Sequence, residues 1–201
     1  MTVTAYGSAA RAFAELVHRI PADAWERPGL GEWDVRALVG HASRSLTTVL
    51  TYLQTRAERE DVTSAAQYYR LVTPEALGID PADVAERGRQ AGRDLGADPA
   101  AAVDDLVAQT LEAAAAAGDP LISVIGGQGI RLRNYLPTRV FELVVHSLDI
   151  ARALDLSFTP PPDALEEALV LAAQVAADGQ GVPVLMALTG REPLPPSFSI
   201  V

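Results

Sequence analysis

Residues 137–154 read PTRVFELVVHSLDIARAL, and their pattern decides the fold. At the 100° rotation per residue of an α-helix, most of the apolar side chains fall on one side, and the others widen that surface past half the circumference. This apolar face is made by Val140, Phe141, Leu143, Val144, Val145, Ser147, Leu148, Ala151 and Leu154. A helix with so wide an apolar face packs against other helices, so the sequence predicts a helical bundle.

A narrow polar strip remains on the same helix. Glu142, His146 and Asp149 follow one another at spacings of four and three, which makes them neighbours on a helix surface. One interpretation is that a mostly buried helix shows this side to water. The other is that Glu-x-x-x-His brings a carboxylate and an imidazole within reach of one metal ion. The helix alone leaves both interpretations open.

The rest of the chain predicts further helices, separated by Pro, Gly and Asp. We expect them at residues 8–20, about 35–59, 81 to about 95, 99 to about 117 and about 162–178. Asp34, Asp80 and Asp98 are placed to cap helix N-termini, the last two before a proline at the first helical position. Gly96 and Gly118 stand where helices commonly end. The segment LISVIGGQGIRLR, residues 121–133, predicts a short strand or hairpin.

Length and composition limit the classes of protein to which this chain can belong. With 201 residues, 49% hydrophobic, the chain is expected to be one domain over 1–201, with a C-terminal extension over about 160–201. The net charge of -10 argues against a nucleic-acid partner. No apolar run is long enough to span a bilayer, and the N-terminus does not resemble a signal peptide, so a cytoplasmic location and no membrane contact are expected.

Two absent residue types narrow the chemistry. Without Cys, the chain has no disulfide, thiolate metal ligand or sulfur nucleophile of its own. Without Lys, it has no Schiff-base or P-loop lysine, since all 16 basic residues are Arg. Any imidazole ligand comes from His18, His41 or His146. His41 lies at the edge of the apolar face of its helix and is the candidate third ligand, whereas His18 is interpreted as a surface or packing residue.

Two segments resemble a known family. PGLGEWDVRALVGHASRSL, residues 28–46, is similar to the P-G-x-W-[T/S]-V-R-D-L-V-x-H-L segment of the mycothiol-dependent maleylpyruvate isomerase N-terminal family, in the DinB-like superfamily. RVFELVVHSLDIARAL, residues 139–154, resembles its second motif, in which Glu-x-x-x-His precedes an acidic residue. LMALTGREPLP, residues 185–195, also looks like the ending of many short members.

The resemblance implies a fold and a site. The fold is an all-α, DinB-like antiparallel four-helix bundle, here with the short hairpin and a short C-terminal helical extension. The metal ligands fall on His41, Glu142 and His146, and the acidic active-site residue falls on Asp149. The full isomerase has a C-terminal domain that supplies an essential arginine, and this sequence ends at Val201, before such a domain. The resemblance therefore implies the metal site but not maleylpyruvate as the substrate.

The implied chemistry uses a divalent metal, expected to be Zn²⁺, and mycothiol, a small actinobacterial thiol, or a similar one as cofactor or co-substrate. Zn²⁺ with three protein ligands keeps an open position and stabilises a thiolate. The expected function is therefore a metal-dependent thiol transferase or isomerase with a small-molecule substrate, working as a monomer or homodimer. Two alternatives stay open: a metal-dependent hydrolase without thiol, and a non-catalytic bundle protein that binds a metal or a small ligand.

Overall fold

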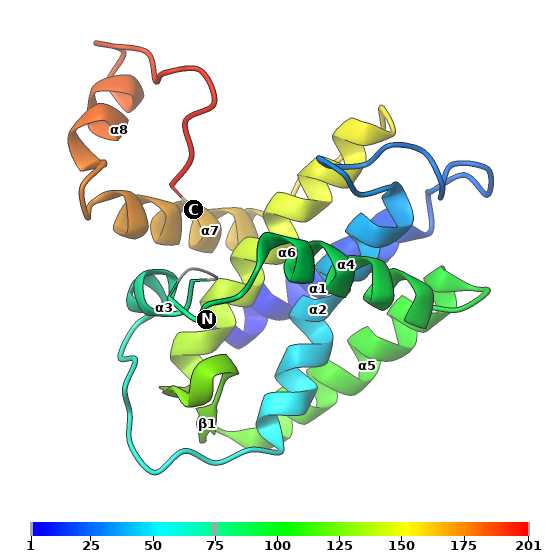
Figure 1. Cartoon of the computed structure of the whole chain (residues 1–201), viewed down its shortest axis with the longest axis horizontal. Helices are drawn as coiled ribbons and strands as arrows, with labels where there is room; N and C mark the ends of the chain where they lie inside the picture. The colour runs from blue at the N-terminus through cyan, green and yellow to red at the C-terminus, as the bar shows by residue number, and fades with distance from the viewer. Residues whose placement is uncertain (1, 74–75, 201) are drawn as a thin grey trace.

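The computed structural model describes residues 2–73 and 76–200, and helices dominate it (Figure 1). Four long helices form the bundle: α1 (Thr2–Val17), α2 (Val35–Leu53), α5 (Pro99–Ala117) and α6 (Leu132–Ala153). Both α1 and α2 pack against α5 and α6. Fully buried side chains fill the space between them, including Phe13, Leu16, Leu38, Leu46, Tyr135 and Leu143. The predicted all-α bundle is confirmed.

Three aspartates begin helices as predicted. Asp34 accepts a hydrogen bond from the backbone N–H of Ala37 at the start of α2. Asp80 and Asp98 cap α4 (Pro81–Asp94) and α5 in the same way, each before a proline. These caps satisfy backbone donors that have no partner inside the helix, so they fix where the helices begin.

The predicted hairpin is present at one end of the bundle. Strands β1 (Leu121–Ser123) and β2 (Gly129–Arg131) pair antiparallel, with Ile122 opposite Ile130, and the single turn η1 (Ile125–Gly127) connects them. Thr55 joins this hairpin to α2, because its hydroxyl donates to the Tyr52 carbonyl and its oxygen accepts from the Ser123 N–H at 2.9 Å.

Helix α4 lies across α2 outside the four-helix core. A Cβ atom on Gly40 of α2 would come within 2.1 Å of the Gly92 nitrogen on α4. The two backbones therefore touch at this crossing, and only glycine fits there. This contact places the polar helix α4 beside the His41 turn of α2.

The C-terminal segment adds two helices. Helix α7 (Pro162–Ala176) packs on α6, α1 and the short helix α3 (Ala65–Leu71). Helix α8 (Gly181–Leu188) contacts α7, has no buried residue and lies apart from the bundle in Figure 1. No helix in the described part of the chain is long and apolar enough to cross a membrane.

Three predicted boundaries were wrong. The helix predicted over 8–20 begins at Thr2, because Tyr6 is buried and its hydroxyl donates to the Ser45 carbonyl at 2.8 Å. The helix predicted to reach 59 ends at Leu53, where the Thr55 contacts begin. The helix predicted from Pro137 begins at Leu132 instead, since burial of the turn before the proline outweighs one lost backbone hydrogen bond.

Candidate metal centre

His41, Glu142 and His146 lie together where α2 and α6 pack side by side. One ligand atom from each lies within 4.8 Å of the others, and all three residues are partly buried. The ring centroids of His41 and His146 are 4.8 Å apart, nearly perpendicular. Two residues one turn apart on α6 thus face a third from the neighbouring helix, an arrangement that bundle metalloproteins use to hold ions.

The polar strip of α6 forms a continuous line of contacts. The Nε2 atom of His146 lies 3.2 Å from Glu142 Oε2, and its Nδ1 lies 3.1 Å from Asp149 Oδ2. The His146 side chain is only 13% exposed, so these carboxylates are its main polar surroundings. The strip therefore faces inward, which contradicts its interpretation as a water-facing surface.

Tyr69 of α3 adds a further hydrogen bond to the polar strip of α6. Its hydroxyl donates to Glu142 Oε1 at 2.7 Å, while the other oxygen of that carboxylate faces His146. Burial and the Glu142 charge raise the pKa of Tyr69 well above its usual value, so the phenol keeps its proton and donates. Both carboxylate oxygens are thereby held in place.

The two imidazoles differ in charge. Burial and the nearby His146 lower the pKa of His41 to about 4, so its ring is neutral at pH 7. Burial acts against the His146 cation, but the hydrogen bonds to Asp149 and Glu142 outweigh it and raise the pKa to about 9. The pKa of Glu142 is about 2, because the hydrogen bond with His146 and the nearby charge of Arg139 outweigh the opposing effect of burial. The carboxylate is therefore ionised and paired.

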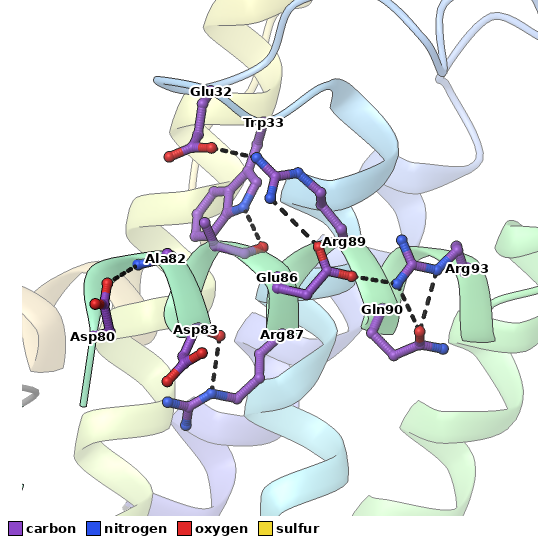
Figure 2. A network of polar contacts seen from close by, with 11 residues as sticks. Glu32, Trp33, Asp80, Ala82, Asp83, Glu86, Arg87, Arg89, Gln90 and Arg93 are labelled. Carbon is purple, nitrogen blue, oxygen red and sulfur yellow. Dashed lines mark hydrogen bonds and ion pairs between the residues drawn. The ribbon is translucent and has the colours of Figure 1, made fainter.

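Trp33 also packs against His41. The Trp33 ring packs on the His41 ring with centroids 4.4 Å apart, and its Nε1 donates to the Ala85 carbonyl of α4 at 2.9 Å (Figure 2). Gly88 leaves room for the indole, since a Cβ there would come within 2.8 Å of the ring. Helix α4 thus fixes Trp33, and Trp33 fixes His41.

The donor set fits a divalent metal. Two tetrahedral zinc ligands at 2.0–2.2 Å are separated by roughly 3.4 Å, close to the Glu142–His146 distance. The Nδ1 atom of His41 is buried and has no hydrogen-bond partner in residues 2–73 and 76–200. A buried polar atom without a partner is unfavourable, so coordination of His41 would remove a penalty as well as add a bond.

A cavity of about 240 Å³ opens beside His41 and Glu142. Three arginines line it: Arg44, Arg87 and Arg139. Arg139 lies over the rings of Tyr135 and Tyr68, at 4.9 and 5.8 Å from the centroids. Within the described residues, none of the three arginines forms an ion pair with a carboxylate.

These arginines repel one another. Burial and the charge of Arg87 lower the pKa of Arg44, whereas the charge of Glu142 acts in the opposite direction on the pKa of Arg139. In a chain of net charge -10, this concentration of unpaired guanidinium groups favours an anionic ligand.

Sequence reasoning missed this part of the site. Arg44 follows His41 by three residues and Arg139 precedes Glu142 by three, so helical spacing could have found both. Arg87 and Tyr69 come from other helices and carry no such signal. His18, interpreted as a surface or packing residue, is exposed in the turn after α1, and its Nε2 lies 2.7 Å from Asp104 of α5, whereas the cluster lies on α2 and α6.

Comparison with known proteins agrees with the motifs. The family model described as the mycothiol maleylpyruvate isomerase N-terminal domain matches residues 6–151, which include the whole His41, Glu142 and His146 cluster. No curated protein matches the chain, and no solved structure does.

Proposed function

The chain belongs to the mycothiol maleylpyruvate isomerase N-terminal domain family, and on that basis we propose that it is a metal-dependent enzyme that uses mycothiol or a similar small thiol. The reaction class is transfer of the thiol or thiol-dependent isomerisation. The observation that carries the proposal is the convergence of His41, Glu142 and His146 beside a cavity lined by unpaired arginines.

In this proposal the three converging side chains hold a divalent metal, with Zn²⁺ as the first candidate. Three protein ligands leave one position for a further ligand, as in catalytic rather than structural zinc sites. When bound, the metal would lower the pKa of a thiol reaching that position from about 8.5, making the thiolate available at neutral pH. The sulfur must come from outside, because the chain has no Cys.

Asp149 and Tyr69 orient the ligands. Asp149 lies 3.1 Å from His146 Nδ1, so it fixes the tautomer that leaves Nε2 free on the Glu142 side. Tyr69 holds one oxygen of Glu142 by a 2.7 Å hydrogen bond and leaves the other directed at the cluster. Asp149 is also the candidate residue for contact with the substrate or thiol.

The arginines indicate the chemistry of the substrate that reacts with the thiol. Arg44, Arg87 and Arg139 line the same cavity as His41 and Glu142, and we assign them the binding of an anionic group on the molecule that the thiol attacks. Guanidinium groups bind carboxylates and phosphates through paired hydrogen bonds, which would orient the reactive atom of the substrate toward the cluster.

A thiol titration of the Co²⁺-loaded protein tests the proposal. Saturating mycothiol is expected to produce the ultraviolet charge-transfer band of a metal–sulfur bond, and His41→Ala is expected to lose both the metal and the band. The band can come only from the added thiol in a protein without Cys. A metal-loaded protein that shows no sulfur band would instead favour hydrolysis by metal-activated water or a non-catalytic role.

A further inference from the structure

A second cavity adjoins the first one. The α4–α5 groove lies between α4 and α5 over α2 and has a volume of about 520 Å³. Arg44 and Arg87 line both the groove and the cavity beside the cluster. The two spaces are therefore neighbours that share two guanidinium side chains as a wall.

The cavity beside the cluster is small for two molecules. Sites for small ligands occupy about 300–1,000 Å³, whereas this one measures about 240 Å³. A thiol with a large hydrophilic body, placed with its sulfur at the cluster, has to put that body elsewhere. The α4–α5 groove is adjacent and has about twice the volume.

The lining of the groove indicates the chemistry of its ligand. Its apolar lining residues are Gly40, Ala91, Ala102, Leu95 and Leu106, and its polar lining residues include Thr47, Asp105 and Gln109. Within the described residues, no hydrogen bond engages the side chains of these three polar residues. Hydroxyl, carboxylate and amide groups together offer both donors and acceptors.

The shared arginines also keep free donors. Arg44 has no hydrogen bond or ion pair among the described residues, and Arg87 donates only to the Asp83 carbonyl of its own helix. Figure 2 shows Arg87 on the side of α4 away from the ion pairs of Glu86, Arg89 and Arg93. Its guanidinium group is therefore not part of that surface network.

We infer that the α4–α5 groove binds the polyhydroxylated body of the thiol whose sulfur reaches the metal cluster. Each hydroxyl of a polyol both donates and accepts, which suits Thr47, Asp105 and Gln109, and the C–H face of a sugar-like ring suits the apolar lining residues. This inference rests on the proposed function and adds to it a binding site on α2, α4 and α5.

The test compares two thiols on the Co²⁺-loaded protein: mycothiol, which carries a sugar-like body, and 2-mercaptoethanol, which has none. The variant Ala102→Trp fills the groove with an indole, and Ala115→Trp places the same side chain at an exposed position of α5 outside the groove. The sulfur charge-transfer band gives the dissociation constant of each thiol without reference to turnover.

We expect Ala102→Trp to weaken mycothiol binding roughly tenfold or more, about 1.4 kcal/mol, and to leave 2-mercaptoethanol binding and the Ala115→Trp control unchanged. Gln109→Ala removes an exposed amide without disturbing packing, and should weaken mycothiol binding several-fold, as one lost hydrogen bond does. Equal mycothiol affinity in the wild type, Ala102→Trp and Gln109→Ala would overturn the groove assignment while the wild-type band upheld the thiol function. Absence of a band in the wild type would overturn both.

Discussion

At the scale of single residues, the site depends on contrasting environments for two histidines. His41 lies against Trp33 with a pKa of about 4, whereas His146 lies between two carboxylates with a pKa of about 9. Only His146 therefore has a proton to lose at pH 7 when it takes a metal. In the proposed site, the neutral His41 ring offers its lone pair to the metal directly, whereas metal binding at His146 would release a proton.

Replacement of His146 by alanine should abolish metal binding and leave the helices intact. The residue is a predicted ligand, while the core is made by aliphatic and aromatic side chains elsewhere. Metal content of the purified variant and its far-ultraviolet circular dichroism check the two parts. Loss of the helical signal would show instead that His146 is a structural residue.

Removal of the Tyr69 hydroxyl should weaken the metal site without removing a ligand. In Tyr69→Phe the Glu142 carboxylate loses its 2.7 Å hydrogen bond, and loss of such an outer contact lowers metal affinity by roughly 10–100-fold. Zinc titration against a competing chelator measures the change. Tyr68→Phe is the matched control, because the Tyr68 hydroxyl has no hydrogen bond among the described residues. Equal zinc affinity in both variants would remove Tyr69 from the site.

The residue scale also shows what sequence alone could predict about the site. Helical spacing on α6 and the resemblance of two segments to the family predicted four site residues: His41, Glu142, His146 and Asp149. The fold brings all four together. Tyr69 could not be predicted, because its contact with Glu142 depends on how α3 packs against α6, which no local pattern encodes.

At the scale of elements, helix α4 has the weakest apolar anchoring among the helices that border the site. Its buried positions are small residues, such as Ala85, Gly88 and Gly92, and polar contacts of Glu86 with Arg89 and Arg93 run along its surface (Figure 2). Exposed ion pairs contribute little to stability. The close crossing at Gly40 and Gly92 and the Trp33 contacts at Ala85 and Gly88 therefore position α4.

A methyl group at Gly40 should disrupt this crossing. Gly40→Ala places a Cβ against the Gly92 backbone, and such overpacking costs about 1–3 kcal/mol of unfolding free energy. Urea denaturation measures the loss. Gly7→Ala on α1 is the control, because among the described residues its Cβ meets only the flexible Arg11 side chain, at 3.2 Å, and alanine favours the helix. Equal stability of the two variants would contradict the role given to the crossing.

Element boundaries show where local sequence signals suffice. Aspartate caps and prolines gave the starts of α2, α4 and α5 correctly, because these contacts form within one turn. Helix α3 was not predicted at all, since it has only seven residues and its burial comes from α6 and α7. The end of α2 likewise depends on Thr55 reaching β1, a contact across 68 residues.

At the scale of the whole molecule, we expect the bundle to fold without the proposed metal. One buried core links α1, α2, α5, α6 and α7, and its side chains come from the whole length of the chain. Zinc fingers unfold without metal because they have almost no such core. The cluster lies at the edge of an interior that is already packed.

Chelation of the metal should therefore lower thermal stability without unfolding the protein. A ligand that binds only the folded state stabilises it by about 2.7 kcal/mol at one hundred times its dissociation constant. The melting temperature should rise with added Zn²⁺ and return to the metal-free value with chelator, while circular dichroism at 25 °C is unchanged. Unfolding by chelator at 25 °C would show that the metal is a structural requirement.

His41, Glu142 and His146 are proposed to hold a metal whose remaining position accepts a thiol. X-ray absorption at the zinc edge tests this proposal most directly, with and without mycothiol. We predict two imidazole nitrogens and oxygen ligands at about 2.0–2.2 Å in the protein alone, and one added sulfur at about 2.3 Å with the thiol. A coordination sphere without imidazole, or one that gains no sulfur at saturating mycothiol, would contradict this metal site.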